Sequence, residues 1–72
     1  MLRKNDEEYK RMIEERNELQ ERINKLDKFV VECRHHGHEN VTLDEIHLME
    51  QQLAPMREYL GILEIRIFRV KE

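Results

Sequence analysis

The chain has little of what usually interrupts or covalently locks a small fold. Its 72 residues include one cysteine, one proline, two glycines and no tryptophan. The lone cysteine, Cys33, excludes a disulfide within the chain and makes a reducing cytoplasm the expected compartment. The scarcity of glycine and proline predicts a nearly all-helical chain. A core of this size supplies only about 3 to 5 kcal/mol of stability, so we expect oligomerisation to add to it.

Long apolar runs and an excess of positive charge are also missing. No segment approaches the roughly 20 apolar residues that a membrane-spanning helix needs, and the charged start of the chain does not resemble a signal peptide. The net charge is -3, which argues against general binding to DNA or RNA, because such proteins spread a basic face over many phosphates. A compact anionic ligand needs only a local cluster of lysine and arginine.

Two hydrophobic ladders with a seven-residue repeat are the strongest positive signal. Both ladders alternate steps of three and four residues, which is the spacing of an amphipathic α-helix. The first ladder consists of Tyr9, Met12, Arg16, Leu19, Ile23, Leu26, Val30 and Cys33. The second consists of Ile46, Met49, Leu53, Met56, Leu60, Leu63, Ile67 and Val70. Two such segments separated by a short break predict an all-α helical hairpin.

Local signals set the expected boundaries of the two helices. We predict a single domain over residues 1–72, with a helix over about 5–33, a loop over 34–41 and a helix over about 42–70. Gly37 supplies the positive φ that ends a helix, and Thr42 with Glu45 has the spacing of a capping box. Pro55 lies inside the second helix, where it removes a backbone hydrogen bond. Because the ladder keeps its phase across Pro55, we predict a kinked helix rather than two helices.

The end of the second helix carries a second apolar face. Residues 65–70 consist of two apolar–basic–apolar triplets, whose alternation suggests a strand, but the chain contains no partner strand. A helix with an additional apolar face is therefore the better interpretation. A two-helix hairpin cannot cover such a face by itself, so we predict that the hairpin assembles into a helical homo-oligomer.

Residues able to perform chemistry are sparse. Cys33, His35, His36 and His38 lie close together in the sequence and are zinc-ligand types. Their spacing matches no established zinc-binding pattern, so we assign neither a metal site nor a cofactor. Pairing Cys33 with His36 as nucleophile and base lacks an orienting third group and a water-excluding cleft. We therefore expect a binding protein without catalytic residues, and not an enzyme.

Tyr9 is the aromatic residue that best suits a ligand. It begins the first ladder, at the end of the expected hairpin, where few residues of the other helix are left to cover it. Lys10 and Arg11 follow it directly. An aromatic ring beside cations can stack on a nucleobase while the cations hold its phosphate. A residue at the end of the core explains Tyr9 equally well. The residues alone leave both interpretations open.

Two groups of residues together resemble a known family. They are Glu18, Leu19, Arg22, Ile23, Lys25, Leu26, Phe29 and Val30 in the first helix, and Glu50, Gln51, Gln52, Leu53, Met56, Tyr59, Leu60, Leu63, Arg66 and Ile67 in the second. With this pattern, the chain resembles small phage proteins of the anti-CBASS cyclic-oligonucleotide sponge family, over most of both helices. The resemblance implies a helical homo-hexamer in the cytoplasm of an infected bacterial host cell. It also implies immune evasion, in which cyclic dinucleotide second messengers are trapped without being cleaved and the CBASS effector is never activated.

The resemblance also assigns roles to particular residues. It implies that Tyr9 stacks on a purine and that Lys25 contacts the phosphates, with Lys10 or Lys28 as alternatives because the sequence does not fix the register. Arg66 is the candidate contact in a separate pocket for cyclic trinucleotides. A cyclic dinucleotide has an approximate two-fold axis, so a homo-oligomer can clasp it with the same side chains from two subunits.

A second class of function fits the same sequence. A small helical-hairpin interaction protein would assemble by heptad packing and bind a host or phage protein. Arg16 favours this alternative, because a polar residue in a helical seam commonly sets register or partner choice. The two hypotheses differ in whether the protein binds a nucleotide at all.

Overall fold

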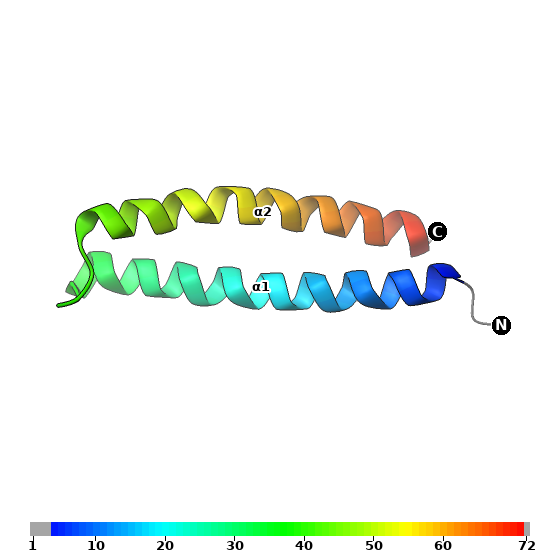
Figure 1. The fold of residues 1–72 in the computed structure, drawn as a ribbon, viewed down its shortest axis with the longest axis horizontal. Helices are drawn as coiled ribbons and strands as arrows, with labels where there is room; N and C mark the ends of the chain where they lie inside the picture. Colours follow the sequence, from blue (N-terminus) through cyan, green and yellow to red (C-terminus); the bar gives the residue numbers. More distant parts are fainter. Residues whose placement is uncertain (1–3, 72) are drawn as a thin grey trace.

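The protein is a rod made of two antiparallel helices. The structure is a computed structural model that describes residues 4–71, with side chains described from Asp6 to Val70. Helix α1 spans Lys4–His36 and helix α2 spans Leu43–Lys71, and a short loop joins them at one end of the rod (Figure 1). The rod measures 55 × 16 × 14 Å. Residues 4–71 contain no strand, so the predicted all-α hairpin is confirmed.

Helix α1 ends later than the sequence predicts. Residues 34–36 belong to α1, whereas the sequence placed them in a loop over 34–41. The helix ends at Gly37, which adopts the predicted positive φ, 72°, and donates its backbone N–H to the carbonyl oxygen of Cys33 at 2.9 Å. No residue before Gly37 opposes helical geometry, so α1 continues up to it. Basic side chains in the last turn also stabilise the helix, because they interact favourably with the negative end of the helix dipole.

Helix α2 begins at the predicted cap and continues through its proline. The Thr42 hydroxyl oxygen accepts a hydrogen bond from the backbone N–H of Glu45 at 3.2 Å, as expected for an N-cap. Pro55 is exposed, so water can hydrate the carbonyl group that the proline leaves without a donor. The prediction of one helix across Pro55 is confirmed, and the kink stays a prediction.

The core is formed by the two ladders. The buried residues are Met12, Leu19, Ile23, Val30, Cys33, Ile46, Leu53, Leu60, Leu63 and Ile67, and each of them is a ladder residue. They form a larger cluster toward the open end of the hairpin and a smaller one, around Cys33, near the loop. In the larger cluster, Leu63 is fully buried. Helical periodicity therefore identified the packed faces of both helices.

Polar contacts also join the two helices outside the core. These contacts are the Arg34–Glu50 pair (Nε to Oε2, 2.6 Å), the Arg57–Asp27 pair (3.3 Å), the Arg16–Glu64 pair (3.8 Å) and a hydrogen bond from the Tyr59 hydroxyl to Glu15. These contacts are exposed and screened by water, so the buried clusters contribute more than these contacts to holding the helices together. Arg16 thus has its partner within the hairpin.

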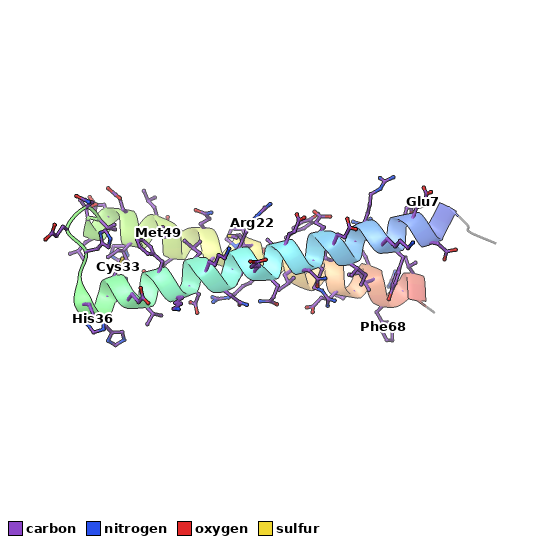
Figure 2. The ribbon with its side chains drawn as sticks, turned by 90° about the horizontal axis from the view of Figure 1, so that it is seen from below. Glu7, Arg22, Cys33, His36, Met49 and Phe68 are labelled. Atoms are coloured by element: carbon purple, nitrogen blue, oxygen red, sulfur yellow. The ribbon has the colours of Figure 1, made fainter. Side chains whose placement is uncertain are left out.

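A second apolar face of α2 has no partner in the hairpin. Ile62, Ile65 and Phe68 are 53%, 59% and 61% exposed. Figure 2 shows the Phe68 side chain pointing away from both helices. We call these three residues the outer apolar face. Within residues 4–71, neither helix contains a segment long and apolar enough to cross a membrane.

Candidate ligand-binding hollows

A shallow hollow lies beside Lys25, where α1 and α2 meet near the middle of the rod. Its volume is about 380 Å³, and we call it the Lys25 hollow. It is lined by Arg22, Lys25, Leu26, Phe29, Gln52 and Met56. Leu26, Phe29 and Met56 are partly buried and pack against the core, so they form an apolar floor. Two cations and one amide are exposed at the rim.

The cations of the Lys25 hollow are only weakly engaged. The Lys25 ammonium lies 3.2 Å from a carboxylate oxygen of Glu21, and Arg22 lies 4.0 Å from a carboxylate oxygen of Glu18. All four side chains are well exposed, and such pairs within one helix are worth about 0.3 to 0.5 kcal/mol. An anion can therefore replace the carboxylates at small cost.

A second hollow contains Arg66. Its volume is about 340 Å³, and we call it the Arg66 hollow. It is lined by Glu8, Arg11, Met12, Glu15 and Arg66. Arg66 comes from α2 and Arg11 from α1, so the fold brings one arginine from each helix to the same hollow. The acidic residues beside them make this hollow less favourable to an anion than the Lys25 hollow.

A hydrogen bond between the helices borders the Arg66 hollow. The Tyr59 hydroxyl donates to the Glu15 carboxylate, and this bond raises the pKa of Tyr59 above its ordinary value of 10.0. Partial desolvation and the negative charge of Glu15 act in the same direction, whereas Arg66 lowers the pKa. Glu15 is thus held by Tyr59 and directed toward the hollow that Arg66 lines.

The structure separates Tyr9 from Lys25. Tyr9 packs against the larger core cluster and stays partly exposed. It lies 16 residues from Lys25 on one continuous helix, which at 1.5 Å per residue is a separation of about 24 Å. That separation is well beyond one nucleotide. Lys10 and Lys28 are exposed and line neither the Lys25 hollow nor the Arg66 hollow.

Sequence reasoning missed the neighbours that complete each hollow. It did not connect Lys25 with Phe29, Gln52 or Met56, nor Arg66 with Arg11. The signal was present in the heptad positions, because Met56 belongs to the second ladder, and Phe29, Gln52 and Arg11 are each next to a ladder residue in the sequence. Finding them required the relative register of α1 and α2, which the ladders alone do not define.

The histidines near the loop do not converge. Cys33 is buried in the smaller core cluster, and Figure 2 shows the His36 side chain pointing out from the end of α1. The His38 ring packs edge-on against Phe29, with ring centroids 5.6 Å apart. In the part of the chain that the structure describes, no three His, Cys, Asp or Glu side chains are placed to hold a metal ion.

Fold and hollows together define a class of small all-α helical hairpins with surface hollows lined in part by lysine and arginine. The comparison with protein families is in line with this class. The family model described as Sequestin matches residues 7–69, and the chain therefore belongs to the Sequestin family, whose name denotes sequestration. The comparisons with curated proteins and with solved structures gave no significant match.

Proposed function

We propose that this protein binds and sequesters cyclic dinucleotide second messengers without cleaving them. In this proposal it is a phage immune-evasion protein that blocks CBASS defence signalling in the infected host cell, and cyclic trinucleotides are a possible second ligand. The observation that carries the proposal is the Lys25 hollow, in which an apolar floor adjoins two weakly paired cations, in a chain of the Sequestin family. That combination suits a nucleobase joined to a phosphate.

The energetics of such a site are sufficient for tight binding. Stacking contributes about 1 to 3 kcal/mol per base, and each charge-assisted hydrogen bond contributes roughly 1.5 to 3 kcal/mol. Two bases and two phosphates held in this way reach nanomolar affinity if the site is preorganised. The net charge of -3 does not oppose this, because surface charges beyond about 10 Å are screened.

The proposed ligand site is shared between subunits. Because Tyr9 and Lys25 are about 24 Å apart along α1, we propose that the site takes Tyr9 from one chain and Lys25 from another. The outer apolar face, Ile62, Ile65 and Phe68, provides a surface for association. We propose a homo-oligomer, of which the hexamer implied by the family resemblance is the expected form.

We further propose that the protein is a trap and not an enzyme. The Lys25 hollow is open and shallow, and its lining contains no cysteine, serine or threonine nucleophile. Cys33 is buried in the smaller core cluster, away from that lining. Bound nucleotide is therefore expected to be released intact when the protein is denatured.

The test is calorimetric titration of the wild type, Tyr9→Ala and Lys25→Ala with a cyclic dinucleotide. Each variant is expected to fold and to bind about 10-fold or more weakly, because a stacking or a charge-assisted contact is lost. Lys28→Ala tests the alternative register, and it is expected to bind like the wild type because Lys28 lines neither hollow. Weakened binding in Lys28→Ala with wild-type affinity in Lys25→Ala would assign the phosphate contact to Lys28 instead. Wild-type affinity in both Tyr9→Ala and Lys25→Ala would contradict the site.

A mixing experiment tests the shared site. When Tyr9→Ala and Lys25→Ala are unfolded together and refolded as a mixture, some neighbouring pairs of chains carry an intact Tyr9 facing an intact Lys25. Binding should then partly recover relative to either variant alone. No recovery in an oligomer that exchanges subunits would contradict the proposal that two chains build the site.

The alternative is a helical-hairpin protein that binds a host or phage protein. The outer apolar face is the observation that favours it, because Ile62, Ile65 and Phe68 are exposed in the single chain. Phe68→Glu tests this alternative together with the oligomer. If Phe68→Glu yields monomers, the face joins copies of this chain; if the wild type is itself monomeric and binds no nucleotide, the protein-binding alternative is favoured.

A further inference from the structure

The Lys25 hollow contains more than the phosphate contact that Lys25 would supply. Its floor includes the ring of Phe29 and the thioether of Met56, and its rim includes the Gln52 amide. All these groups belong to the same chain as Lys25, and the floor joins α1 to α2. A nucleobase held at Lys25 thus has an aromatic surface available without Tyr9.

We propose that the Lys25 hollow is a base-binding subsite in which Phe29 and Met56 support a purine and Gln52 reads its edge, favouring adenine over guanine. This inference rests on the proposed function, because it names the base whose phosphate Lys25 would hold. In the assembled protein, Tyr9 of another subunit stacks on the opposite face of the same base. Each base then lies between an apolar floor and an aromatic cover.

The floor is suited to a flat aromatic group. Phe29 and Met56 are partly buried, so their positions are fixed by the core while one side remains accessible at the hollow. The edge of the Phe29 ring is further held by the edge-on contact with His38 at 5.6 Å. Aromatic rings stack on any base, and a methionine thioether adapts its shape to the ring above it.

The rim provides both base recognition and phosphate binding. Gln52 is exposed, and its amide nitrogen makes only a long contact of 3.8 Å with the Met56 sulfur, so the amide is available to a ligand. A glutamine amide presents one donor and one acceptor, which match N7 and the exocyclic amine of adenine. Guanine presents two acceptors on the same edge and leaves the glutamine acceptor unmatched. Arg22 and Lys25, which make only exposed pairs with Glu18 and Glu21, would hold the phosphate.

The test compares Gln52→Met with Gln51→Met in titrations with cyclic di-AMP and cyclic di-GMP. Gln51 is the matched control because it is the same residue type, is exposed and does not line the hollow. The wild type and Gln51→Met should prefer cyclic di-AMP. Gln52→Met should lose that preference by roughly 5- to 150-fold, the range for one paired glutamine–adenine contact. An unchanged preference in Gln52→Met would overturn the role of Gln52.

A second variant tests the floor, and a second ligand separates the two proposals. Phe29→Leu keeps the core apolar but removes the ring, and it should weaken cyclic di-AMP binding roughly 5- to 150-fold with the helical content unchanged.

AMP, titrated at high concentration, should shift the Met56 methyl resonance. If the wild type, Phe29→Leu and Gln52→Met all bind cyclic dinucleotides with the same affinity, this inference alone is overturned. A wild type that binds AMP at Met56 but no cyclic dinucleotide overturns the proposed function alone. No response to any of these nucleotides overturns both.

Discussion

Replacing Leu63 with alanine tests how the hairpin is held together. Leu63 is fully buried in the larger core cluster, so Leu63→Ala leaves a cavity between the two helices. Truncation of a fully buried leucine costs about 2 to 5 kcal/mol, from lost transfer free energy and from the cavity. We expect about 3 to 5 kcal/mol here, which equals the whole stability expected of a single hairpin of this size. An isolated hairpin carrying Leu63→Ala should therefore be largely unfolded.

The assay is urea denaturation followed by far-ultraviolet circular dichroism at two protein concentrations. With a slope of about 1 kcal/mol per molar urea, Leu63→Ala should lower the midpoint by about 3 to 5 M, which for an isolated hairpin places it near 0 M. The matched control is Leu48→Ala, because Leu48 is 64% exposed and its truncation should cost less than about 0.5 kcal/mol. If the protein is an oligomer, the midpoints should also rise with protein concentration. A difference below about 1 kcal/mol between the two variants would refute this account of the core.

Three further predictions concern single groups. Gly37→Ala should destabilise the hairpin by about 1 to 2 kcal/mol in thermal denaturation, because alanine is strained at a φ of 72°; no loss would contradict the turn geometry. The Arg34 hydrogen bond lowers the pKa of Glu50 below its ordinary value of 4.5. The free energy of unfolding that the wild type has in excess of Glu50→Gln should therefore be fully present above pH 4.5 and lost as the pH falls through the lowered pKa of Glu50. An excess that stays constant down to acid pH would oppose this. In a Tyr9→Phe background, a spectrophotometric titration should show Tyr59 ionising with a pKa above 10.0. Removing the charge of Glu15 should lower the pKa of Tyr59, and a pKa that does not change would argue against their hydrogen bond.

The fold was predictable because its main determinants are local. The seven-residue spacing identified the buried faces, and Gly37 and Thr42 marked the turn between the helices. The end of α1 was placed too early, since residues 34–36 are basic and polar but nothing in them opposes a helix. The basic and polar composition of residues 34–36 therefore suggested a loop, whereas the backbone stays helical through His36, directly before Gly37.

The candidate site was harder to predict because it depends on non-local geometry. Lys25 and Arg66 were selected by resemblance, but each hollow is completed by residues of the opposite helix, Gln52 and Met56 beside Lys25 and Arg11 beside Arg66. Gln52 and Arg11 line those hollows only in the relative register in which the two helices pack. The separation of Tyr9 from Lys25, in contrast, follows directly from one unbroken helix, and it supports the proposal of a site shared between subunits.

The most direct test of sequestration is calorimetry of the wild-type protein with cyclic di- and trinucleotides, followed by heat denaturation and analysis of the released ligand. We predict tight binding of at least one cyclic dinucleotide, with a stoichiometry that reports sites shared between subunits, and recovery of the nucleotide unaltered. Recovery of a cleaved nucleotide would contradict sequestration, and the absence of binding to any ligand of this class would contradict the proposed function.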